Sequence, residues 1–225
     1  MRSFVSGLVL AAGASTRLGQ PKQLLPFGAT TLLGHVVAEA RAASALDEVI
    51  VVIGGAADQV RERVDLGGVL VVENPQFGEG CSASYRTGLG VVDARAEAVA
   101  ILLGDQPGVG HEVIDLVADE WRRVRARIQL ASYRGREGHP LIFASTLFDQ
   151  LAALTGDKAA WKIVDTHRDV VRAVPIDRPH PRDINTVQDY EALVRGDSPH
   201  PSPSTASPCG GAWGRGLRGG SRRRG

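Results

Sequence analysis

The chain has 225 residues, of which 43% are hydrophobic and 23% charged, and its formal net charge is +1. That length predicts one large α/β domain or two small ones, and the composition is that of an ordinary globular protein that can bury a core. The charge is uneven, because removing residues 196–225, with five Arg and one Asp, leaves 21 basic and 24 acidic residues. A mildly acidic body argues against broad nucleic-acid binding.

The apolar residues at the amino terminus could be mistaken for a secretion signal. Their run is short and continues into a glycine-rich turn that carries Arg17 and Lys22, so we interpret it as a buried first strand. No stretch approaches the roughly 20 consecutive apolar residues that span a bilayer. The two cysteines, Cys81 and Cys209, lie far apart and lack the spacing of a zinc site. We therefore expect a cytoplasmic protein that binds neither membranes nor nucleic acid.

Apolar runs of strand length alternate with helical patterns. In chain order, we predict a strand at residues 4–11, a helix at 30–43, a strand at 49–53, a short helix at 56–64, strands at 69–72 and 98–103, a helix at 111–123 and a strand at 127–132. The β-branched run at 49–53 is typical of a strand buried on both faces. This alternation predicts an α/β fold with a doubly wound, mostly parallel, Rossmann-like sheet.

Three motif-like segments follow predicted strands, at residues 12–22, 73–84 and 104–107. In doubly wound sheets, ligands bind beyond the carboxyl ends of the strands. We therefore expect these three segments to converge on one binding site.

The last part of the chain, residues 196–225, is Pro/Ser-rich and then Gly/Arg-rich. It has almost no apolar side chains to offset the entropy lost on ordering, so we predict one domain at 1–195 followed by a disordered tail. Its Arg/Gly character leaves an RNA-binding role open, although a solvated tail without essential function is the simpler interpretation.

The loop after the first predicted strand is suited to a triphosphate. Its small residues let the backbone approach a ligand, and exposed N–H groups in such a turn form an anion-binding concavity. Arg17 and Lys22 add positive charge. The loop is not a Walker A motif, because Gly19 is followed by Gln20 instead of Lys and Ser or Thr, and it lacks the dinucleotide pattern G-x-G-x-x-G.

The loop pattern L-A-A-G-x-S-x-R-x-G-x-x-K, from Leu10 to Lys22, resembles the nucleotide-binding signature of the molybdenum-cofactor nucleotidyltransferase-like superfamily. It is most similar to the molybdenum cofactor cytidylyltransferase members. Later segments agree in order and spacing: N-P-Q-F-G-E-G at 74–80, L-G-D-Q-P at 103–107, G-H-P-L-I-F at 138–143 and D-I-N-T at 183–186. The resemblance covers residues 5–195 and omits the tail.

The resemblance implies roles for individual residues. Catalysis would depend on the charges of Arg17, Lys22 and Asp105, and Mg²⁺ would bind Asp105 together with Asn185 or Asp183. The implied nucleotide contacts are Leu10, Ala11, Ala12, Gly13, Ser15, Arg17, Lys22, Asn74, Ser84 and Asp105. The implied acceptor contacts are Gly138, His139 and Pro140. An acceptor phosphate is already ionised near neutral pH, so the reaction needs charge stabilisation and positioning but no general base.

Several of these residues also have a structural interpretation. Asp105 could cap a helix that Pro107 opens. Asp183 or Asn185 could cap a helix near residues 187–193, and His139 could be purely structural.

Two segments depart from the superfamily pattern. The chain reads G-D-K-A-A-W at 156–161, where the family usually has G-D-x-G-A-R on the acceptor side. The late motif has Asn185, as in related guanylyltransferases, where many cytidylyltransferases have Asp.

The resemblance implies a Mg²⁺-dependent CTP:molybdopterin cytidylyltransferase that forms molybdopterin cytosine dinucleotide and pyrophosphate. The methyl group of Ala12 favours CTP, since guanylyltransferases typically carry L-A-G-G and a methyl group there narrows the base pocket. One alternative is a guanylyltransferase of the same superfamily, acting on molybdopterin or a phospholactate-type acceptor. Another is a non-catalytic nucleotide- or cofactor-binding partner of a molybdoenzyme. A transient complex with a molybdoenzyme or chaperone is a further expected partnership.

Overall fold

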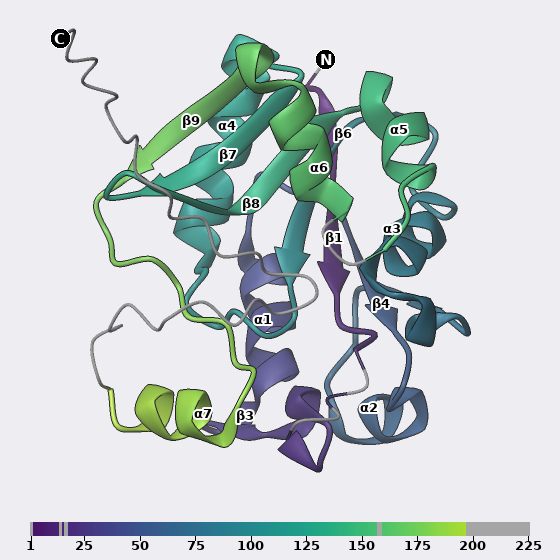
Figure 1. The fold of residues 1–225 in the computed structure, drawn as a ribbon, viewed down its shortest axis with the longest axis vertical. Coiled ribbons are helices and arrows are strands. Elements are labelled where there is room, and N and C mark those ends of the chain that lie inside the picture. Colours follow the sequence, from purple (N-terminus) through teal and green to yellow (C-terminus); the bar gives the residue numbers. More distant parts are fainter. Residues whose placement is uncertain (1, 14, 16–17, 157–158, 197–225) are drawn as a thin grey trace, which may run out of the picture.

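A computed structural model describes residues 2–13, 15, 18–156 and 159–196. Within this part of the chain, seven strands form a single sheet with helices on both faces, and two further strands form a small hairpin (Figure 1). No helix among the described residues is long and apolar enough to cross a membrane. The predicted α/β fold class is confirmed.

The elements follow in chain order. The strands are β1 (Phe4–Leu10), β2 (Pro26–Phe27), β3 (Thr30–Thr31), β4 (Glu48–Ile53), β5 (Leu70–Glu73), β6 (Ala96–Leu103), β7 (Ile128–Tyr133), β8 (Arg136–Ala144) and β9 (Val171–Ile176). The helices are α1 (Leu32–Ala42), α2 (Ala57–Arg63), α3 (Cys81–Leu89), α4 (His111–Val124), α5 (Phe148–Ala152), α6 (Ala159–Thr166) and α7 (Val187–Val194).

The sheet has the strand order β5-β4-β1-β6-β8-β7-β9. Its neighbouring strands are parallel except at β8, which runs antiparallel to both β6 and β7. The reversal at β8 follows from its tight connection to β7, since a two-residue turn joins only antiparallel strands. The carboxyl ends of β5, β4, β1 and β6 therefore lie along one edge of the sheet.

Alternate residues of the central strands face opposite sides of the sheet. On β1, Leu8 and Leu10 belong to the core under α3, α5 and α6, whereas Val9 belongs to the core under α1 and α2. On β4, Ile50 and Val52 belong to the same core as Leu8, under α3, α5 and α6. This period of two buries both faces, which is why these strands read as unbroken apolar runs.

The predicted elements agree with the observed ones to within about two residues. The helix predicted from residue 30 begins at Leu32, because Thr31 is its N-cap and accepts a hydrogen bond from the N–H of Gly34 at 3.0 Å. The sequence patterns did not identify β2, β3, α3, β8, β9, α5 or α6. The helix α5 is only five residues long, too short for a helical period to be recognised.

The end of the described chain folds back beside the β2–β3 hairpin (Figure 1). Ile184 packs there with Leu25 and Leu32, and the hydroxyl of Tyr190 donates to the carbonyl of Pro26 at 2.7 Å. Because of these contacts, residues 183–185 lie beside the carboxyl ends of β1 and β6.

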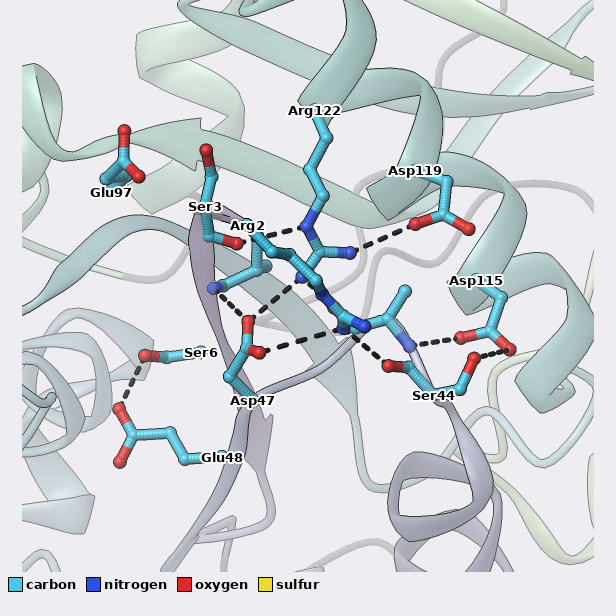
Figure 2. Close-up of polar contacts among 12 residues, drawn as sticks. Arg2, Ser3, Ser6, Ser44, Asp47, Glu48, Glu97, Asp115, Asp119 and Arg122 are labelled. Atoms are coloured by element: carbon cyan, nitrogen blue, oxygen red, sulfur yellow. Dashed lines mark hydrogen bonds and ion pairs between the residues drawn. The ribbon is translucent and has the colours of Figure 1, made fainter.

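At the other edge of the sheet, Arg122 of α4 joins several elements (Figure 2). Its guanidinium donates to the carbonyl of Ser3 at 3.0 Å, the carbonyl of Ala45 at 2.7 Å and the carboxylate of Asp47 at 2.9 Å. The Asp47 carboxylate also accepts from the N–H of Val5 at 2.8 Å. We assign this network to the fold, because it lies at the amino ends of the strands.

Candidate functional site

The site is built where β1, β4 and β6 end. The N–H of Gly104 donates to the carbonyl of Leu10 at 3.0 Å, and the N–H of Ala11 donates to Val52 at 2.8 Å. The carbonyl of Ala12 accepts from Gly55, just beyond β4, at 3.1 Å. The end of β1 is therefore bonded to the residue that follows β6, and the start of the loop after β1 is bonded to β4 and to Gly55.

Two glycines allow this close approach of the strand ends. A Cβ atom at Gly104 would lie 2.9 Å from Cβ of Ala11, and one at Gly54 would lie 2.7 Å from the carbonyl oxygen of Ala12. Both distances are shorter than carbon–carbon or carbon–oxygen contacts tolerate. Glycine is thus required at both positions for the loop to keep its place.

Lys22 and Asp105 form an ion pair at the centre of the site. The ammonium Nζ of Lys22 donates to Oδ2 of Asp105, although 83 residues separate the two in sequence. The side chains are only 18% and 9% exposed, so water screens the pair weakly. The tertiary structure thus brings two residues of the predicted set into direct contact.

The late D-I-N-T segment reaches the same point. The side-chain amide of Gln106 donates to Oδ1 of Asp183, and the N–H of Ile184 donates to the carbonyl of Asp105 at 3.2 Å. Burial raises the pKa of Asp183, and the negative charge of Asp105 raises it further. The carboxyl groups of Asp105 and Asp183 therefore share one weakly hydrated region.

The capping interpretations do not describe these acidic residues. The helix α4 begins at His111 after Gly110, so Asp105 does not cap it. At α7, Thr186 is the N-cap and forms a reciprocal capping box with Asp189. The N–H of Asn185 donates to Asp189 at 3.1 Å, which leaves the side chain of Asn185 outside the cap.

The carboxylates suit a magnesium ion held by few protein ligands better than a metal held entirely by protein side chains. The described residues contain no group of three or more His, Cys, Asp or Glu side chains arranged to hold a metal. Magnesium usually takes one or two carboxylates and completes its shell with water and substrate phosphates. Asp105 and Asp183 offer that donor set, with Asn185 next along the same segment.

Asn74 and Ser84 organise the segment at the end of β5, residues 73–84. Both side chains are buried, and the amide of Asn74 donates to the hydroxyl of Ser84 at 3.1 Å. The carbonyl oxygen of the Asn74 side chain accepts from the N–H of Gln76 at 2.9 Å. Their predicted nucleotide contacts stay a prediction, and the observed bonds show that both residues shape this segment.

The segment predicted to contact the acceptor lies on β8. Gly138, His139 and Pro140 are all buried, and the peptide bond between His139 and Pro140 is cis. The carbonyl of His139 accepts from the hydroxyl of Tyr133 at 2.6 Å. Trp161, which stands where the superfamily usually has arginine, packs edge-on against the imidazole with ring centres 6.1 Å apart.

Burial lowers the pKa of His139 to about 4, so its imidazole is neutral near pH 7. Its Nε2 atom has no hydrogen-bond partner within the described part of the chain. The predicted contact with an acceptor stays a prediction, and with this side chain 2% exposed, His139 offers little surface to a ligand.

Some predicted residues lie outside the described part of the chain, and two residues of the site were not predicted. Arg17 lies outside the described residues, as do residues 157–158 of the G-D-K-A-A-W segment. The sequence patterns did not single out Gln23, which bonds to the loop after β1, or Gln106, which bonds to Asp183. In the sequence, these two glutamines stand out only because they follow Lys22 and Asp105 directly. A single buried glutamine produces no periodic pattern and no change in composition.

A glycine-containing loop, a lysine and a carboxylate pair at the carboxyl edge of a doubly wound sheet are the features expected of an α/β nucleotidyltransferase. Comparisons with known proteins agree: the MobA-like NTP transferase domain matches residues 7–171. This chain belongs to that family.

The relatives come from several bacteria. A nicotine blue oxidoreductase of Paenarthrobacter nicotinovorans is 33% identical over 168 residues, which are 69% of this chain and 79% of that protein. A probable molybdenum cofactor guanylyltransferase of Bacillus cereus is 33% identical over 118 residues, covering 51% of this chain and 56% of the relative.

Solved structures extend the likeness over most of the chain. Rv0371c from Mycobacterium tuberculosis H37Rv has a TM-score of 0.80 and 40% identity, covering 87% of this chain and 100% of that one. The same protein has been solved in complex with manganese, with a TM-score of 0.75 and 39% identity, covering 85% of this chain and 98% of that one.

Proposed function

We propose that this nucleotidyltransferase moves CMP from CTP onto the phosphate of molybdopterin, in the cytoplasm and with Mg²⁺ as cofactor. The observation that carries the proposal is the meeting of Lys22, Asp105 and Asp183 beside the loop after β1. In a weakly hydrated site, one ammonium group can bind a triphosphate, and two carboxylates can bind the divalent ion that accompanies it.

In the proposed reaction, an oxygen of the acceptor phosphate attacks the α-phosphorus of CTP. A new bond forms between that oxygen and the α-phosphorus, and the bond to the departing pyrophosphate breaks. Lys22 and the N–H groups of the loop stabilise negative charge on the phosphates, and we assign Arg17 to the same task. Asp105 and Asp183, with Asn185 beside them, would hold the divalent cation, which supplies further positive charge at the phosphate oxygens when bound.

The base preference rests on Ala12. Its side chain is only 5% exposed, and its methyl group lies in the core beside Gly54. An effect on base choice would therefore act through the position of the loop backbone. One methyl group rarely contributes more than about 1–3 kcal/mol of discrimination, so other contacts must contribute as well.

A guanylyltransferase is the second candidate, and a specific observation favours it. The Bacillus cereus relative is named as a probable molybdenum cofactor guanylyltransferase. Asn185 agrees with that alternative. Either base leaves the proposed roles of Lys22 and Asp105 unchanged.

The test is pyrophosphate release by the purified chain with molybdopterin, Mg²⁺ and either CTP or GTP. We expect kcat/KM for CTP to exceed that for GTP by tenfold or more, and Ala12→Gly to narrow this ratio. Asp105→Asn should lower turnover by roughly a hundredfold while the chain stays folded.

Each competing function gives a different outcome. Equal or better use of GTP would replace the cytidylyl proposal by the guanylyl one. Nucleotide binding without pyrophosphate release would support a non-catalytic cofactor-binding role. An oxidoreductase, the activity for which the Paenarthrobacter relative is named, would release no pyrophosphate from either nucleotide.

A further inference from the structure

The loop after β1 is tied to itself by one buried side chain, that of Gln23. This residue lies in the short 3-10 turn Lys22–Leu24 and is 2% exposed. Its amide nitrogen donates to the carbonyl of Ala11 at 2.8 Å and to that of Gly13 at 2.7 Å. Its amide oxygen accepts from the hydroxyl of Ser15 at 3.3 Å. Both N–H donors of the amide are therefore used on the loop.

These bonds fix the direction in which the loop presents its donors. In a trans peptide, the C=O of one residue and the N–H of the next point in opposite directions. Because the carbonyl of Ala11 faces Gln23, the N–H of Ala12 points away from it. The carbonyl of Ala12 faces Gly55, at 3.1 Å, so the N–H of Gly13 is directed away from β4.

The same bonds position the backbone of Lys22, the residue that carries the ammonium group of the site. Ser15 has a left-handed backbone with φ of 53°, and its hydroxyl accepts from the N–H of Lys22 at 2.9 Å. Gln23 holds that hydroxyl from the other side. The amide of Gln23 thus links Lys22, through the hydroxyl of Ser15, to the loop that carries the N–H donors.

We propose that Gln23 is a positioning residue for the triphosphate of the NTP, acting through the loop backbone and Lys22. This inference rests on the proposed function, because it assigns the loop to an NTP. Gln23 is too buried to touch the nucleotide, so its effect is to hold the loop in its binding conformation before the ligand arrives. Glutamate cannot replace it, since a carboxylate would face two carbonyl oxygens without a donor.

The test compares Gln23→Met with Gln129→Met. Gln129 is the matched control, because it is also fully buried and its amide donates to a main-chain carbonyl, that of Val117, at 2.6 Å. It lies between β7 and α4, outside the site. For each variant, isothermal titration gives the Kd of Mg·CTP and of Mg·GTP, and thermal unfolding without ligand gives Tm.

We expect both variants to lower Tm, and only Gln23→Met to weaken binding of the better nucleotide, by tenfold or more (about 1.4 kcal/mol). Equal nucleotide affinity in Gln23→Met and wild type, within twofold, would overturn the inference. Equal weakening in both variants would overturn it too, since the effect would then follow stability alone. If Gln23→Met does not fold, Gln23→Asn, which keeps the amide but shortens its reach, is measured against the same criteria.

The wild-type titration separates this inference from the proposed function. If the wild-type chain binds neither CTP nor GTP in the presence of Mg²⁺, the proposed function itself is wrong. If it binds one of them and Gln23→Met binds equally well, only the positioning role is wrong.

Discussion

The ion pair between Lys22 and Asp105 predicts that the protein binds a divalent cation weakly until a nucleotide is present. The ammonium group occupies the carboxylate that we propose as a ligand of the cation. Two unit charges about 4 Å apart interact by about 4 kcal/mol at the effective dielectric constant of 20 that describes such sites. Hydration of the released ammonium group offsets much of this interaction energy, so the net cost to cation binding is smaller.

Lys22→Met removes the competing charge and keeps most of the side-chain volume. We expect it to bind Mn²⁺ without nucleotide tenfold to a hundredfold more tightly than wild type, or about 1.4–2.7 kcal/mol. The same variant should unfold at a lower temperature without metal, because Asp105 loses its partner in a poorly hydrated place, and Mn²⁺ should restore most of the loss. Mn²⁺ affinity is measured by electron paramagnetic resonance of the free ion.

A triphosphate should draw Lys22 away from Asp105, so CTP or GTP is expected to tighten Mn²⁺ binding in wild type more than in Lys22→Met. Lys162→Met is the matched control, since it removes one lysine charge whose ammonium group donates to the carbonyl of Thr155 instead. Mn²⁺ affinity that is equal in wild type and Lys22→Met, or weaker in the variant, would refute the reasoning.

The remaining predictions concern pH and backbone contact. The hydrogen bond that Nδ1 of His111 donates to the Glu39 carboxylate raises the pKa of His111. This pair therefore stabilises the fold below the unfolded-state pKa of histidine, and that stabilisation is lost as pH rises through the raised pKa. Glu39→Gln should therefore lower Tm more at roughly pH 6 than at about pH 9, and an equal loss at both would contradict this. Gly54→Ala should weaken nucleotide binding by tenfold or more, because its methyl group would lie 2.7 Å from the carbonyl of Ala12. Gly90→Ala lies outside the three segments of the site, and its added atom would come no closer than 3.4 Å to the surrounding atoms, so this variant should bind as wild type does. Similar affinities for the two alanine variants would rule out that explanation.

The sequence alone determined the strands and helices whose periodicity is strong and whose length is ordinary. The run Glu48–Ile53 and the helix His111–Val124 were recognisable because burial on two faces, or on one helical stripe, imposes a repeating pattern. It also determined the edge of the sheet at which the loop segments would meet, because parallel strands place their carboxyl ends together.

Only the tertiary structure decided which of those residues touch. Lys22 and Asp105 are 83 residues apart, and no local pattern states that the ammonium group rests on the carboxylate. The role of Gln23 is equally invisible in sequence, because it depends on three loop atoms reaching one buried amide. Local periodicity reports how a segment meets the core, whereas the pairing of polar groups depends on the folded path of the whole chain.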